Sequence, residues 1–113
     1  MSSNPWMRVW IGDLLTSTTR LSTEQFGAYV LLLFDYRTNG PLPADDDQLA
    51  QISRLSKRRW RQHKPALRDY FQERDGRWFQ ERMERQLKEL REYTAKRSSI
   101  GRKAANARYH KES

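Results

Sequence analysis

The sequence predicts a small α+β domain, mainly helical, with the architecture of a winged helix-turn-helix. Residues 54–68 carry seven Lys or Arg side chains and no acid, shortly after the acidic helix start Asp45–Asp47. A hairpin signal follows, in which Asp75-Gly76 lies between the aromatic residues Phe71 and Phe79. The order of helix, turn, basic helix and two-stranded ribbon is typical of winged helices, for which nucleic acid is the first partner to consider.

The first expected element is a short strand at Trp6–Ile11, because aromatic and β-branched residues dominate that segment. We expect it to pair with the hairpin at Arg74–Phe79. The next element is a helix that begins after Ser22, since Ser22-Thr-Glu-Gln25 has the form of a capping box. Asn39-Gly40-Pro41 should end that helix at about Thr38.

The helix at 22–38 is apolar on nearly every side. Such helices are usually buried between other elements, so we expect it to be the central core helix, with the N-terminal strand and a later helix covering its second face. We expect Phe26, Leu33 and Trp60 to share one core. The alternative is that the apolar helix forms a dimer interface.

Capping and turn residues also predict the elements that follow residue 44. Asp45–Asp47 should begin a short helix, since carboxylates favour a helix N-terminus, whereas three consecutive carboxylates splay too far apart to hold a metal ion. Ser56 should cap the basic helix, and Pro65 should kink or restart it. Asp75-Gly76 should form a type I′ turn. A charged amphipathic helix is expected from Glu81 to about Lys96, so the domain boundaries are 1–97 for the winged helix and 98–113 for a basic, flexible tail.

A helical wheel defines the candidate binding face of the basic helix. With Trp60 pointing inward, Arg58, Arg61 and Gln62 point outward, because successive side chains are about 100° apart. Such side chains can reach phosphates and base edges; the alternative is a solvated face that keeps the protein soluble. The candidate nucleic-acid-binding residues, including flanking, wing and tail positions, are Lys57, Arg58, Arg59, Arg61, Gln62, Arg68, Arg74, Arg77, Arg102, Lys103 and Arg108.

Composition supports the same class of partner. Twenty-two Lys and Arg against 14 Asp and Glu give a formal net charge of +8, which favours a polyanion: nucleic acid first, an anionic membrane surface second. The absence of cysteine excludes disulfides and is compatible with a reducing cytoplasm. The longest apolar run, 28–34, is too short to cross a bilayer, and the first residues lack a secretory pattern. We therefore expect a cytoplasmic protein that makes no membrane contact.

Other chemistry finds little support in the sequence. His63, expected to be half-buried beside Trp60, and His110 have no evident nucleophile or acidic partner, and no phosphate-binding glycine motif is present. We expect no enzymatic activity, no cofactor and no metal site. Trp6, Trp10 and Trp78 could stack on bases, but their apolar neighbours favour positions in the core.

The chain also resembles the YdaU-like family of small phage- and prophage-encoded proteins, over about residues 5–92. The resemblance lies in Gly12-Asp13-Leu14, Gly27-Ala28-Tyr29, Gly40-Pro41-Leu42-Pro43 and Asp75-Gly76-Arg77-Trp78, and in the basic tail from Gly101. Members look like the winged-helix N-terminal domains of phage replisome organisers. This resemblance implies a role in phage DNA replication or its regulation.

The expected function is thus a DNA-binding module, monomer or homodimer, with duplex favoured over single-stranded DNA. The alternative is a protein–protein adaptor that recruits or inhibits a replication component, with the winged helix as scaffold. Fold alone does not decide between them.

Overall fold

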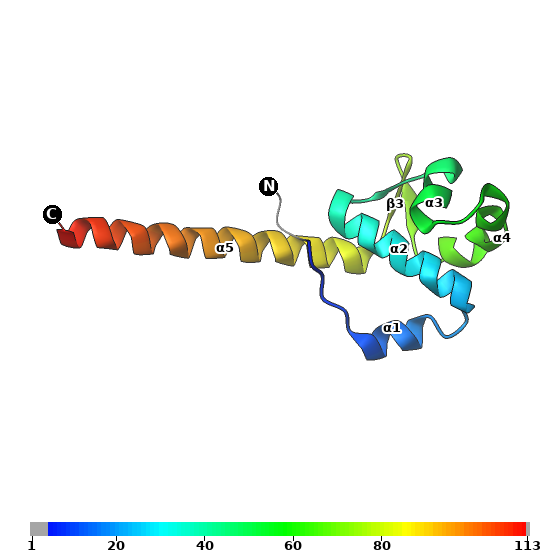
Figure 1. The fold of residues 1–113 in the computed structure, drawn as a ribbon, viewed down its shortest axis with the longest axis horizontal. Coiled ribbons are helices and arrows are strands. Elements are labelled where there is room, and N and C mark those ends of the chain that lie inside the picture. Colours follow the sequence, from blue (N-terminus) through cyan, green and yellow to red (C-terminus); the bar gives the residue numbers. More distant parts are fainter. Residues whose placement is uncertain (1–4, 113) are drawn as a thin grey trace.

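The computed structural model describes the backbone of residues 5–112 and the side chains of residues 5–97. Over this range five helices accompany a three-stranded antiparallel sheet (Figure 1). The chain order is α1 (Ile11–Ser17), α2 (Thr23–Asn39), β1 (Leu42–Pro43), α3 (Asp46–Ser53), α4 (Lys57–Arg68), β2 (Gln72–Arg74), β3 (Arg77–Phe79) and α5 (Glu81–Glu112). The α+β, mainly helical class is confirmed.

Helix α2 runs through the middle of the body, with α3 and the sheet on one side and α1 on the other (Figure 1). Its predicted capping box is present: the Gln25 N–H donates to Ser22 Oγ (3.1 Å), and the Ser22 N–H donates to Gln25 Oε1 (3.0 Å). Gly40 ends the helix with φ 85°, a left-handed angle that glycine adopts without strain. The capping box and the glycine stop are confirmed, one residue beyond the predicted end.

The core joins α2 to the later elements. Trp60 and Leu33 lie in it together, as predicted, along with Trp78 and Leu42. Phe26 was predicted to join them, but it is only partly buried and lies outside this core. Phe34 is half exposed, so α2 is not covered on every side.

The strand predicted at Trp6–Ile11 is wrong. Residues 5–10 form no strand, and Ile11 begins helix α1. The place beside β3 is taken by β1, in which Leu42 pairs with Trp78 and Pro43 with Arg77, giving the sheet order β1-β3-β2. A two-residue strand containing proline gives almost no periodic signal, and proline is tolerated there because β1 is an edge strand.

In the N-terminal segment, the backbone N–H and C=O groups of Arg8 form hydrogen bonds with a side chain instead of with a strand. The Arg8 N–H donates to Gln86 Oε1 (2.9 Å), and Gln86 Nε2 donates to the Arg8 carbonyl (3.2 Å). One side-chain amide therefore makes the donor and acceptor pair that a neighbouring strand would have supplied.

The hairpin and the last helix begin where predicted. Asp75 and Gly76 have φ 51° and 71°, the positive angles that a type I′ turn requires. Helix α5 begins at Glu81 and buries Met83 and Leu90. Its predicted end near Lys96 is wrong, since helical backbone continues to Glu112. Side chains 98–113 lie outside the described residues, so the flexible tail stays a prediction.

A polar network attaches the start of α5 to α2. The buried Tyr36 hydroxyl donates to the Glu84 carboxylate and accepts from the Gln80 N–H (3.2 Å). Gln80 Nε2 donates to the Tyr29 hydroxyl (2.9 Å) and to the Tyr70 carbonyl (3.1 Å). Burial and the Glu84 carboxylate raise the pKa of Tyr36, so this hydroxyl stays a donor at neutral pH. The position of α5 is therefore set by bonds inside the body.

Candidate nucleic-acid interface

Helix α4 is held by its inner face. Trp60, His63 and Leu67 are buried, and the Trp60 indole N–H donates to Asp46 Oδ1 (3.0 Å) at the start of α3. Ser56 caps the helix as predicted, since its hydroxyl accepts the Arg59 N–H (3.2 Å). The helix continues through Pro65 to Arg68, so it does not restart there, and the predicted alternative, a kink at Pro65, stays a prediction.

The outer face of α4 matches the helical wheel. Arg58, Arg61 and Gln62 are exposed, opposite the fully buried Trp60. Arg68 is exposed one turn before the hairpin. Within residues 5–97, the structure pairs none of these three arginines with a carboxylate. Their guanidinium groups are therefore available to an external anion.

Two lysines of α4 form ion pairs with the acidic start of α3. Lys64 Nζ lies 2.8 Å from Asp46 Oδ1, and Lys57 Nζ lies 3.4 Å from Asp47 Oδ1. The hydrogen bond from Lys64, with a second from the Trp60 indole, lowers the pKa of Asp46. Asp46 and Asp47 thus pair with lysines of the next helix, and these ion pairs connect α3 to α4.

Arg59 is used inside the fold. Its Nε donates to Glu24 Oε1 (2.7 Å), and a second guanidinium nitrogen contacts Glu24 Oε2, which ties α4 to the first turn of α2. This bidentate pair lowers the pKa of Glu24 to about 2. Of the predicted binding residues, Arg59 is therefore the one most committed to another partner.

His63 lies beneath the same pair and is more buried than predicted, with 8% of its surface exposed. Its Nδ1 lies 3.1 Å from Gln25 Nε2, and its Nε2 lies 3.2 Å from Glu24 Oε2. The second contact is close but is not a hydrogen bond, because Nε2 has no partner with hydrogen-bond geometry among the described residues. The histidine packs α4 against α2.

The hairpin places two predicted arginines side by side. Arg74 and Arg77 are a cross-strand pair in β2 and β3, and both are exposed. The Arg74 guanidinium lies 4.4 Å from the centre of the Phe79 ring, and Arg77 Nη1 donates to the Pro41 carbonyl (3.1 Å). These contacts hold the two side chains on the surface of the hairpin.

The remaining predicted residues, Arg102, Lys103 and Arg108, lie outside the side chains that the structure describes. Sequence reasoning did not select Arg54, an exposed residue in the turn before α4 that adopts a left-handed conformation (φ 62°). Its basic charge was visible in the sequence, but nothing local predicts a positive φ for arginine. The core positions predicted for Trp6 and Trp10 are wrong, since they are 49% and 61% exposed, whereas Trp78 is buried as predicted.

Comparison with known proteins places the chain in a family. The family model described as "Protein of unknown function (DUF1376)" matches residues 5–88, which is most of the chain. The chain belongs to the DUF1376 family. The matched residues run from the N-terminal segment into α5, so the whole body described above is the DUF1376 unit.

One curated relative is the uncharacterized protein YdaU of Escherichia coli (strain K12), to which the chain is 38% identical over 109 residues. This match confirms the expected YdaU-like family. It covers 96% of this chain but 38% of YdaU, so the DUF1376 chain spans well under half the length of that relative. No solved structure matches the chain. In the part of the chain that the structure describes, no helix combines the length and the apolar character needed to cross a membrane.

Proposed function

We propose that this DUF1376 chain is a non-enzymatic DNA-binding module, with α4 as the helix that enters the major groove. In this proposal Arg74 and Arg77 on the hairpin, together with the basic end of α5, contact phosphates. The resemblance to phage replisome organisers suggests the setting, which is phage DNA replication or its regulation in the cytoplasm of a bacterial host.

The topology supports this proposal. The order α2, β1, α3, α4, β2, β3, with the sheet arranged β1-β3-β2, is the order expected of a winged helix-turn-helix. In such domains the second helix of the helix-turn-helix is the recognition helix, and the hairpin that follows is the wing. Here α4 would be the recognition helix, and β2 with β3 would be the wing. These elements carry the predicted basic residues that lie outside the tail.

The observation that carries the proposal is the difference between the paired and the unpaired cations of α4. Lys57, Arg59 and Lys64 form ion pairs with carboxylates of α2 and α3, whereas Arg58 and Arg61, beside Gln62, have no such partner among the described residues. Guanidinium groups without an internal partner can contact phosphates without giving up an existing ion pair. Arginine and glutamine at neighbouring outward positions can also make bidentate contacts with guanine and adenine in the major groove.

Fluorescence anisotropy tests the proposal directly. The full chain would be titrated into a labelled duplex and a labelled single strand of the same sequence, each at two salt concentrations. We expect binding that weakens steeply as salt rises, with the duplex preferred, because phosphate contacts release counterions and a helix fits the major groove. Absence of affinity for both DNAs at low salt would end the proposal.

A second candidate function is a protein–protein adaptor that recruits or inhibits a replication component. The observation that favours it is the exposure of Trp6, Trp10, Ile11 and Leu15, since monomers seldom leave several large apolar side chains together on the surface. The two candidates predict different outcomes of the titration. An adaptor that uses the winged helix only as a scaffold would bind neither DNA.

A further inference from the structure

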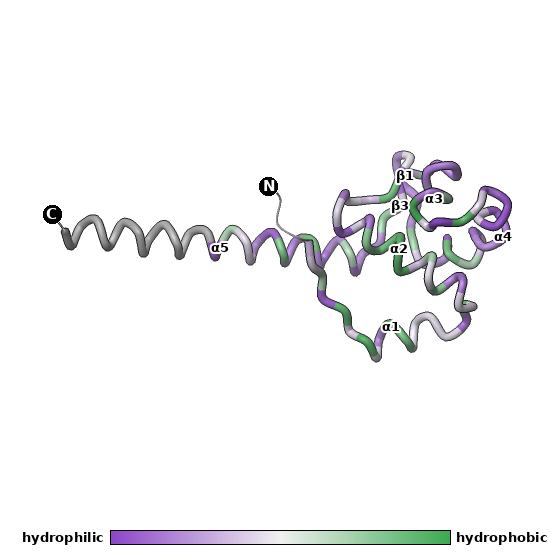
Figure 2. The backbone as a smooth tube through the Cα atoms, in the orientation of Figure 1, coloured by the Kyte–Doolittle hydropathy of each residue, from purple (hydrophilic) through white to green (hydrophobic). Residues whose placement is uncertain are grey.

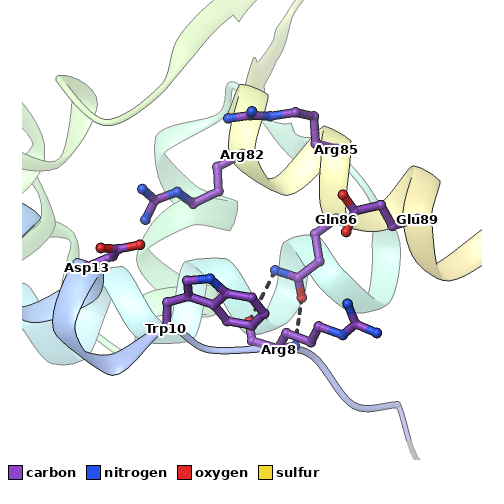
Figure 3. A pocket seen from close by; sticks show the side chains of 7 residues that line it. All are labelled: Arg8, Trp10, Asp13, Arg82, Arg85, Gln86 and Glu89. Atoms are coloured by element: carbon purple, nitrogen blue, oxygen red, sulfur yellow. Dashed lines mark hydrogen bonds between the residues drawn. The ribbon is translucent and has the colours of Figure 1, made fainter.

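Residues 6–17 form a strap across the body, and the body holds this strap by its backbone. Arg37 Nε donates to the Trp6 carbonyl (2.6 Å), and the Tyr70 hydroxyl donates to the Ser17 carbonyl (2.6 Å). Between these two anchors, the Gln86 side chain bonds to the N–H and the carbonyl of Arg8. Figure 3 shows the two Gln86 bonds to Arg8. Since these anchors use backbone atoms, they leave most of the strap's side chains free.

Those free side chains are largely apolar and largely exposed. Ile11 is 69% exposed, Trp10 61% and Leu15 60%. Figure 2 shows hydrophobic stretches along this segment, in α1 and before it. The exposed large apolar residues that the structure describes are Trp6, Val9, Trp10, Ile11 and Leu15 in the strap, with Phe34 and Tyr93 nearby.

The strap also leaves space beneath it. A groove of about 290 Å³ lies between the strap, α2 and the start of α5. Its lining is mainly apolar, with Phe26, Val30 and Phe34 from α2 facing Trp10 and Leu14 of the strap. The strap therefore offers apolar surface outward and lies over apolar surface that it does not fill.

We propose that the strap and this groove are the face on which a second copy of the chain docks, as a dimer with twofold symmetry. This proposal goes beyond DNA binding, because it uses a surface that does not include α4 or the hairpin. A twofold interface must be self-complementary: if one residue of the first copy contacts a second residue of the other copy, the same two residues also meet with the copies exchanged.

The charges of the strap meet that condition. Residues 6–17 carry one base, Arg8, and one acid, Asp13, and are neutral in a chain of net charge +8. Figure 3 shows Arg8 and Asp13 on opposite sides of Trp10. A twofold axis that passes near Trp10 and Ile11 brings Arg8 of each copy towards Asp13 of the other. Two copies of a basic protein also repel one another least where their surface is neutral.

Other occupants fit these charges less well. An anionic membrane or an acidic partner would select an excess of basic side chains, but the strap itself has none. The neighbouring rim on α5 adds Arg82 and Arg85 with Glu89, which leaves a small basic excess at one edge of the strap. That rim is the reason for including lipid vesicles among the tests.

Sedimentation velocity over a wide range of protein concentration tests the dimer. We expect a species of about 27 kDa, twice the 13.6 kDa of the chain, in exchange with monomer. Ile11→Asp should shift the equilibrium to monomer. Because Ile11 is exposed in one copy, its circular dichroism spectrum should stay as in wild type, and so should its melting temperature when both proteins are measured at a concentration at which wild type is monomeric. A wild-type chain that stays monomeric at all concentrations would overturn the proposal, whether or not it pellets with vesicles of anionic phospholipid.

Charge exchange tests the twofold geometry itself. Arg8→Asp places like charges opposite Asp13 of the partner, and Asp13→Arg places like charges opposite Arg8, so each variant alone should dimerise more weakly by roughly tenfold or more. An equimolar mixture of the two variants should regain the affinity, because in the mixed dimer every acid at these two positions again faces a base of the other copy. Arg20→Asp is the control, with the same change of charge as Arg8→Asp at an exposed site outside the strap, and should dimerise like wild type. A dimer that forms equally well in every variant, or a mixture that does not recover, would show that the face is a different one.

Discussion

At the scale of single residues, Trp60 is the core side chain that fixes helix α4, the helix that carries the candidate site. It is fully buried, lies 6.0 Å from Trp78 between ring centres, and bonds through its indole to Asp46. The same helix presents Arg58 and Arg61 to solvent. The position of the exposed arginines is thus determined by how one aromatic side chain is packed.

Replacement of Trp60 by alanine should remove that support. Truncating a buried tryptophan costs about 3–5 kcal/mol, which is a large part of the stability of a small domain. Chemical unfolding followed by circular dichroism measures the loss. Trp10→Ala is the matched control, because that side chain is 61% exposed and its truncation should cost little at a concentration at which the chain is monomeric. Equal losses in both variants would contradict the assignment of Trp60 to the core.

The pair of Glu24 with Arg59 predicts a pH dependence. Arg59 lowers the pKa of Glu24 to about 2 from its usual value near 4.5. A carboxyl whose pKa is depressed in the folded state contributes stability above its unfolded pKa, and this contribution is lost as pH falls through the folded value. The free energy of unfolding should therefore fall between about pH 4.5 and pH 2.

Glu24→Gln should flatten that part of the pH profile, while the variant should be less stable than wild type at neutral pH. Glu92→Gln on the exposed part of α5 is the control and should leave the profile unchanged. Unfolding curves in urea at several acidic pH values provide the measurement. Parallel profiles for wild type and Glu24→Gln would show that the pair contributes nothing to folding.

At the scale of elements, α5 divides into two parts. Its first turns are bonded to α2 and to the strap through Glu84 and Gln86, whereas all side chains from 91 to 97 are exposed. A polar helix without tertiary contacts is only marginally stable in water. Residues 91–97 therefore add little to the packing of the body, and in the proposed function the basic end of α5 contacts DNA.

Deletion of residues 98–113 should consequently leave the melting temperature nearly unchanged and weaken DNA binding. The deletion removes four Lys or Arg residues and one Glu. Differential scanning fluorimetry and the anisotropy titration measure the two effects. A variant with a neutral Gly/Ser segment of equal length separates loss of charge from loss of chain. A large drop in melting temperature would mean that this segment docks on the body or on a second copy.

At the scale of the whole molecule, local rules predicted the elements that depend on neighbouring residues. Ser22 with Gln25, Ser56 before α4, and Asp75-Gly76 each specify their structure within a few residues, and each is confirmed. The inward direction of Trp60 also followed from helical spacing alone. These features predicted the mainly helical class and the exposed face of α4.

Features that depend on distant partners were not predictable. Trp6–Ile11 has the composition of a strand, but Leu42 takes the place beside β3, and the Gln86 amide, 78 residues from Arg8, takes the role of a neighbouring strand. Arg59 looked as free as Arg58 until Glu24, 35 residues earlier, was found beside it. The exposed side chains of Trp6 and Trp10 follow from the same displacement of the N-terminal segment.

If the outer face of α4 binds DNA, as we propose, the salt dependence of binding should change in one double variant. Duplex affinity would be measured across a series of salt concentrations for wild type and for Arg58→Ala/Arg61→Ala, with Glu92→Ala as control. We predict that the double variant keeps its melting temperature, binds more weakly, and loses about 0.9 from the slope of log affinity against log salt for each phosphate contact removed. Wild-type affinity and an unchanged slope in the double variant would contradict the claim.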